Sequence, residues 1–171
     1  MKKLLSIILC LAMIFSLAAC GSKEEEITIG KLKEFQVGDY KLNLPETYEL
    51  NDLEEVKAEP NCIAMLTDSK GKLPDLWIYE DECQGTTIKE HIMNMDAEWD
   101  YNEMSYYSKG DANFAKTVYD EDWYGQKLVN EHYYKIGNDA KVLSFDFAYP
   151  AADDAQLAHN YIVAIAEALG F

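Results

Sequence analysis

The acidic residues between Asp120 and Glu131 have the spacing of a calcium-binding loop. Asp120, Asp122, Gly125 and Glu131 occupy the first, third, sixth and twelfth positions of a twelve-residue segment. In such a loop the carboxylates supply oxygen ligands to a hard cation, and the glycine permits a sharp turn. This spacing makes a calcium-dependent binding module one hypothesis for the protein.

Two residues within the same segment argue against a calcium site. Tyr124 stands where an oxygen-rich side chain is expected, and Lys127 places a positive charge inside the loop. The flanking residues alternate between apolar and polar, which predicts strands rather than the helices that flank an EF-hand loop. An acidic β-turn is the better interpretation, and a weak surface calcium site at Asp120, Asp122 and Glu131 is the alternative.

Aromatic residues form a second candidate site. They follow a predicted helix or lie in a predicted turn, and they are Trp99, Tyr106, Tyr107, Trp123 and Tyr124. Exposed rings give a large contact area at a small entropic cost, so they suit the binding of a protein, a peptide or a sugar. The alternative is that Trp99 belongs to the core and that the tyrosines line a sheet edge with their hydroxyls in water.

No set of catalytic residues is recognisable from spacing. His91, His132 and His159 fall on three different predicted elements, and no two of them have the separation of a helical zinc pair. The serines lack the glycine-flanked elbow of a hydrolase, and the chain has no phosphate-binding or dinucleotide-binding glycine motif. We therefore expect a non-catalytic protein without a cofactor. An envelope hydrolase with unidentified catalytic residues is the alternative.

The N-terminus resembles the lipobox signal of bacterial lipoproteins. Lys2 and Lys3 precede a short apolar run that ends in Leu17-Ala-Ala-Cys20. This resemblance implies cleavage before Cys20, a diacylglycerol on its sulfur, and attachment to the outer face of the cytoplasmic membrane. Residues 1–19 would then be the signal peptide, 20–26 a lipidated tether, and 27–171 a single domain.

Cys62 and Cys83 are expected to form a disulfide. Both would lie outside the cytoplasm, where such a bond persists. They are placed symmetrically about residue 72, in the turn-rich loop 68–75 between two predicted strands. A slip of one residue in the strand register would turn the side chains to opposite faces, so a pair of free thiols is the alternative.

The strong negative charge of the chain limits its partners. The formal net charge is -16, and loss of Lys2 and Lys3 with the signal peptide would make it -18. Nucleic acid and anionic lipid surfaces would both be repelled by such a chain. We therefore expect no nucleic-acid partner, and contact with the membrane only through the lipid anchor.

Hydrophobic patterning predicts an α+β domain with an antiparallel sheet and flanking helices. A capping box at Thr87 and Glu90 begins one helix, and Asp153 or Asp154 begins the last, with Leu157 and Leu169 on its apolar face. The predicted elements in chain order are a hairpin over 27–44, a short helix within 48–60, strands flanking 68–75, the helix from 87, strands over 113–119, 127–136 and 141–149, and the helix from 153.

The predicted order of elements resembles the PsbP and Mog1 group of small domains. The segment Phe35-Gln-Val-Gly-Asp-Tyr-Lys-Leu-Asn-Leu-Pro-Glu-Thr-Tyr48 is similar to that group's early strand, which runs into a Leu-Pro turn and an aromatic residue. The resemblance implies an α/β/α sandwich and an accessory or binding role. Together these features predict a non-catalytic surface lipoprotein that binds a protein, a peptide or a cell-envelope component.

Replacing Cys20 with serine tests the predicted anchor. Cells that produce the full chain and are labelled with a fatty-acid analogue should incorporate label into the native protein and retain it with membranes. The Cys20→Ser variant should lose both properties, because the serine hydroxyl does not accept the diacylglycerol. Label and membrane retention that persist in the variant would contradict the prediction.

Overall fold

The computed structural model describes residues 27–51, 54–95, 100–110 and 112–171. The predicted signal, the lipidation site Cys20, and Trp99 lie outside these residues. Within the described part of the chain, no helix is long and apolar enough to cross a membrane.

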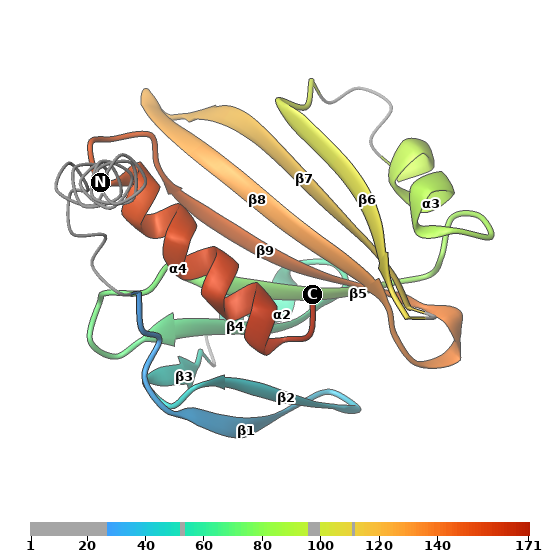
Figure 1. Cartoon of the computed structure of the whole chain (residues 1–171), viewed down its shortest axis with the longest axis horizontal. Coiled ribbons are helices and arrows are strands. Elements are labelled where there is room, and N and C mark those ends of the chain that lie inside the picture. Colours follow the sequence, from blue (N-terminus) through green and yellow to red (C-terminus); the bar gives the residue numbers. More distant parts are fainter. Residues whose placement is uncertain (1–26, 52–53, 96–99, 111) are drawn as a thin grey trace, which may run out of the picture.

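A seven-stranded antiparallel sheet forms the centre of the molecule (Figure 1). Its strand order is β3-β4-β5-β9-β8-β7-β6, and the antiparallel sheet predicted from the sequence is confirmed. The strands are β3 (Tyr48–Leu50), β4 (Cys62–Asp68), β5 (Leu76–Asp81), β6 (Glu103–Lys109), β7 (Ala112–Trp123), β8 (Gln126–Ile136) and β9 (Val142–Pro150).

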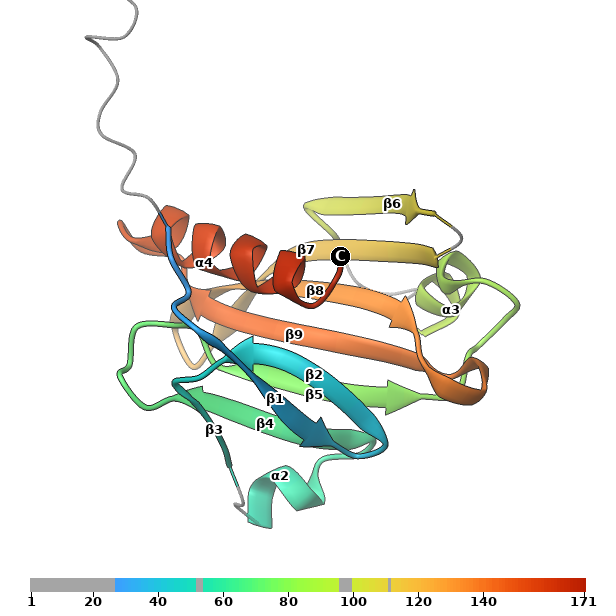
Figure 2. The ribbon, with the colours of Figure 1, turned by 60° about the horizontal axis from the view of Figure 1, so that its bottom comes forward.

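One face of the sheet is covered by the N-terminal hairpin and the C-terminal helix (Figure 2). The hairpin pairs β1 (Leu32–Val37) with β2 (Tyr40–Pro45) through a turn at Gly38, as predicted. Helix α4 (Ala155–Ala168) buries Ile162 and Ile165 against this core. Leu157 was predicted on the buried face, but it is 42% exposed because the apolar stripe is offset toward 162, 165 and 166.

Helix α3 (Ile88–Met95) packs on the opposite face, against β7 and β8. Its first turn is held as predicted by the Thr87 hydroxyl, which accepts a hydrogen bond from the Glu90 amide at 3.1 Å. Ile88 and Ile92 pack against Tyr134 in a second, smaller apolar cluster. Because α3 is short, it leaves the part of this face over β5, β9 and the hairpin end of β7 and β8 open.

Several predicted elements differ from the structure. The segment 48–60 contains β3 before the short helix α2 (Glu54–Ala58), and a short 3₁₀ turn (Asn138–Ala140) separates β8 from β9. Residues 103–109 form the edge strand β6, which was not predicted because nearly all of its side chains face solvent and give no alternating apolar signal. Strands β7 and β8 extend to a two-residue turn at Tyr124 and Gly125, whose φ values are both positive, at 51° and 86°.

Cys62 and Cys83 are free cysteines in the structure, so the predicted disulfide is not formed. The β4–β5 register pairs Cys62 with Tyr79, and an irregularity follows at Cys62 and Ala64. Cys83 lies beyond the end of β5, where its thiol is directed to the Thr87 carbonyl. The prediction placed Cys83 opposite Cys62, whereas Tyr79 lies there, so the centre assumed for the loop was wrong.

Gly137 marks a close contact between the sheet and the N-terminal hairpin. A Cβ atom there would lie 2.6 Å from the Tyr40 hydroxyl and 3.1 Å from Cγ of Leu143. Gly137→Ala should lower the free energy of unfolding by roughly 1–3 kcal/mol, because the added methyl overpacks this junction. Tyr40→Phe in the same chain should recover part of that loss. Chemical denaturation of the two single variants and the double variant measures the coupling, and strictly additive effects would contradict this contact.

Candidate functional site

The open part of the sheet face opposite α4 is hollowed into two adjacent cavities. Their volumes are about 220 and 380 Å³. Both are lined by Tyr79, Tyr119, His132 and Asp146, so they lie side by side, and we call the two together the aromatic groove. Trp77, Glu121, Trp123 and Asn130 complete the larger cavity, and His91, Tyr101 and Tyr134 are among the residues that complete the smaller one.

Strand alternation brings these side chains to one face. Successive residues of a strand point to opposite sides, so alternate residues of β5, β7, β8 and β9 line the groove. The register pairs Asp146 with Trp77 on one side and with His132 on the other. This places a carboxylate at the centre of the groove, between the aromatic residues of β5 and those of β7 and β8.

The rings in the groove are held by contacts with one another. Trp77 and Tyr79 are stacked, with ring centroids 6.4 Å apart and planes at 15°. Tyr119 makes edge contacts with His132 at 5.2 Å and with Tyr101 at 6.1 Å. A ring fixed in this way loses little further freedom when a ligand binds, which favours recognition.

The polar groups of the groove surround His132. Its Nδ1 lies 3.2 Å from the Tyr134 hydroxyl and 3.7 Å from Oδ1 of Asp146, and its Nε2 lies 3.4 Å from the Tyr119 hydroxyl. Burial, reinforced by the negative charge of Asp146, raises the pKa of Tyr79 above its ordinary value. Tyr79 therefore keeps its phenolic proton at neutral pH.

The aromatic candidates chosen from the sequence do not converge on one patch. Trp123 lines the groove and is 56% exposed, and Tyr124 lies beside it at the hairpin tip, 95% exposed. Tyr106 and Tyr107 lie on β6, away from the groove lining: Tyr106 packs under Lys89, and Tyr107 stacks on Phe114. Trp99 lies outside the described residues.

Sequence reasoning missed most of the groove. The candidates chosen from the sequence did not include Trp77, Tyr79, Tyr119 or Asp146. Trp77 and Tyr79 are two residues apart on one predicted strand, and Tyr119 lies at the end of another. His91 and His132, which were expected on unrelated elements, line the same cavity. The signal available in advance was the spacing of two between Trp77 and Tyr79 on one strand, which predicts a shared face.

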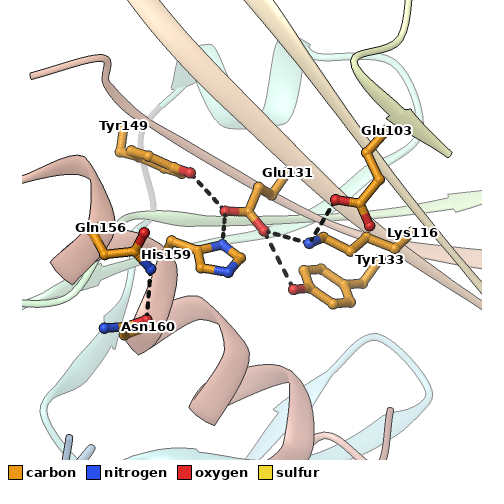
Figure 3. A network of polar contacts seen from close by, with 8 residues as sticks. All are labelled: Glu103, Lys116, Glu131, Tyr133, Tyr149, Gln156, His159 and Asn160. Atoms are coloured by element: carbon orange, nitrogen blue, oxygen red, sulfur yellow. Dashed lines mark hydrogen bonds and ion pairs between the residues drawn. The ribbon is translucent and has the colours of Figure 1, made fainter. Parts of the chain in front are cut away.

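Glu131 occupies a different place, between the sheet and α4 (Figure 3). Its side chain is fully buried. Oε1 accepts a hydrogen bond from the Tyr149 hydroxyl at 2.7 Å and lies 2.7 Å from Nδ1 of His159. Oε2 lies 3.3 Å from Nζ of Lys116 and 3.4 Å from the Tyr133 hydroxyl. Both carboxylate oxygens are thus satisfied by the protein itself.

This arrangement favours the acidic hairpin turn over the calcium loop at 120–131. The segment is a β-hairpin rather than a loop, with Asp120 paired to Val129 and Asp122 paired to Lys127. Oδ1 of Asp122 accepts a hydrogen bond from the Gly125 amide at 2.8 Å, which stabilises the turn. Among the residues that the structure describes, no group of three or more His, Cys, Asp or Glu side chains could hold a metal ion.

Comparison with known proteins identifies a fold but no close relative. No family of known proteins matches the sequence, and no curated protein matches it. The solution structure of cyanobacterial PsbP (CyanoP) from Synechocystis sp. PCC 6803 superimposes with a TM-score of 0.57 at 13% identity, over 88% of this chain and 97% of that one. The fold is PsbP-like.

The PsbP-like fold is a mixed α+β arrangement with a mostly antiparallel sheet, as the sequence predicted. A protein of unknown function from Pseudomonas aeruginosa, PA94, is also similar, with a TM-score of 0.43 at 12% identity over 79% of this chain and 94% of that one. At these identities the likeness to CyanoP shows the fold alone. The function must be inferred from the groove.

Glu131 can be tested as a structural residue. Glu131→Gln should lower the free energy of unfolding by on the order of 3 kcal/mol, because it removes the charge that faces the largely buried Lys116 and His159. The matched control Asp122→Asn, at the exposed hairpin end, should change it by less than about 0.5 kcal/mol.

Thermal melts with calcium or with magnesium at equal ionic strength complete this test. Both cations should shift the native chain and the two variants equally, because screening by salt does not distinguish them. A stabilisation specific to calcium that disappears in either variant would restore the calcium-loop interpretation.

Proposed function

We propose that the protein is a non-catalytic, lipid-anchored binding module of the cell envelope whose aromatic groove holds a protein, a peptide or an envelope component. The anchor is the predicted diacylglycerol on Cys20, which would place the domain on the outer face of the cytoplasmic membrane. We further propose that the fold is the α/β/α sandwich of the PsbP and Mog1 group, with α4 and α3 on its two sides.

The observation that carries this proposal is the convergence of Trp77, Tyr79, Tyr119 and Trp123 on one open depression. Ligand sites are concave, largely apolar and furnished with a few placed polar groups, and the groove has all three properties. Its rings come from β5 and β7, two strands of one hydrogen-bonded sheet, so the site is present before any ligand arrives. Such preorganisation supports tight binding, since less freedom is lost on association.

An envelope hydrolase is the second candidate function. The approach of His132 to Asp146 at 3.7 Å within the groove favours it, because this pair could position a general base. However, the ring nitrogens of His132 face the phenols of Tyr119 and Tyr134, which are poor nucleophiles while protonated. Burial also raises the pKa of the nearby Cys62 thiol, which disfavours the reactive thiolate. These contacts support binding over hydrolysis.

Site-specific photocrosslinking in cells that produce the full chain tests the proposed function. A photoreactive phenylalanine replaces Trp123 in the groove or, as the control, Leu157 on the exposed side of α4. Position 123 should give an adduct of one defined mass, and position 157 should not give that adduct. Adding Trp77→Ala should reduce the adduct about tenfold, because removing a stacking ring costs about 1.5 kcal/mol. An adduct that is insensitive to Trp77→Ala, or equal at both positions, would contradict a ligand in the groove.

A further inference from the structure

We infer that the aromatic groove binds a cationic polypeptide segment, one that inserts arginine or lysine side chains between its rings. This inference rests on the proposed binding function and specifies its ligand. It follows from the difference between the two faces of the sheet: lysines are bound on the α4 face, whereas carboxylates and open aromatic rings line the groove on the other face.

Three lysines of the central sheet are engaged on the α4 face. Lys116 pairs with Glu131, Lys135 donates to the Leu169 carbonyl at 3.0 Å, and Lys109 donates to the Phe171 carbonyl at 3.5 Å. None of the described residues that line the two cavities of the groove is a lysine. The chain therefore keeps its permanent positive charges away from the groove.

The groove carries carboxylates instead. Asp146 lies at its centre, Glu121 lines the larger cavity, and Asp81 lines the smaller one. Asn130 donates a hydrogen bond to Oε2 of Glu121 at 3.3 Å, which orients that carboxylate within the groove. Negative groups in a recess focus the electrostatic potential, so a cation is attracted to this point of the surface more than an anion or a neutral group.

The aromatic rings select the same type of ligand. A cation over the face of a tryptophan or tyrosine ring is attracted by the ring's electron distribution. On the α4 face the protein satisfies its own rings in this way: Nζ of Lys135 lies 4.9 Å from the Phe145 ring centroid and 5.1 Å from that of Phe171. In the groove, Trp77 and Trp123 are the more favourable rings for such a contact. A ligand would supply the cation.

The shape of the groove favours a peptide over a single small amine. Two cavities meet at a shared wall formed by Tyr79, Tyr119, His132 and Asp146. One extended segment can place two long basic side chains into adjacent cavities, since alternate residues of an extended chain project to the same side. Lysine and arginine also pack their aliphatic stems on apolar walls while their charged ends reach polar groups.

A set of matched peptides tests the charge requirement. The probe is the peptide fluorescein-Gly-Arg-Gly-Arg-Gly-amide, labelled at its N-terminus, and its matched analogue carries citrulline in place of both arginines. Fluorescence anisotropy is measured with the full native chain in detergent at low and high salt. The arginine peptide should bind at least tenfold more tightly than the citrulline peptide, and raising the salt should weaken its binding.

Variants on the two faces of the sheet locate the binding. Glu121→Gln combined with Asp146→Asn should weaken binding of the arginine peptide at least tenfold, and Trp77→Ala should do the same. Asp122→Asn, which removes an acid from the opposite face of β7, should leave binding within twofold of the native chain. Circular dichroism and thermal melts verify that each variant is folded.

Each contrary result has a separate meaning. Equal binding of the arginine and citrulline peptides would overturn the cationic inference and leave the groove as the proposed binding site. The same loss in Asp122→Asn as in the groove variant would show unspecific attraction to an acidic protein, and would also overturn the inference. Absence of arginine-peptide binding overturns the inference, whereas failure of the crosslink at position 123 overturns the proposed function.

Discussion

Glu131 joins the sheet to α4 through a carboxylate that is fully removed from water. A buried carboxylate is costly unless several partners compensate for its lost hydration. Lys116 on β7, Tyr133 on β8, Tyr149 on β9 and His159 on α4 provide that compensation. Because these partners come from three adjacent strands and the helix, they fix the position of α4. The opposite face is left for other contacts.

The division between the two faces explains how one sheet serves both stability and recognition. On β8, Glu131 and Tyr133 face α4, whereas Asn130 and His132 face the groove. A shift of one residue in the pairing would exchange these sets, placing Glu131 in the open groove and a histidine in the buried network. The ion pair between Lys116 and Glu131 thus favours the same register that forms the groove.

The sequence predicts those parts of the fold that depend on local signals. The turn at Gly38, the capping by Thr87 and the alternation of β8 all lie within short segments. Strand β6 lacked such a signal, since an edge strand exposed on both sides has no apolar alternation. The acidic run from Asp120 was interpreted as a turn between two strands, and the structure carries both strands through it, with Asp120 and Asp122 paired in the sheet.

The groove could not be predicted because its residues are brought together only by pairing between distant strands. Trp77 and Asp146 are separated by about half of the described chain and become neighbours through the β5–β9 register. The assumed cysteine bridge failed for a related reason, since the β4–β5 register pairs Leu66 with Leu76 and places Cys62 opposite Tyr79 rather than Cys83. The composition of a turn-rich loop does not reveal the register of the strands that flank it.

The chain enters the domain beside α4. Thr28, Ile29 and Gly30 line one cavity with Tyr161 of α4, on the helix side of the sheet (Figure 2). With an anchor at Cys20, seven residues before Ile27, the domain could stand no more than about 25 Å from its attachment point. The helix side would then be the one nearer the bilayer. The groove would open outward, so that its ligand arrives from the extracellular medium rather than from the lipid surface.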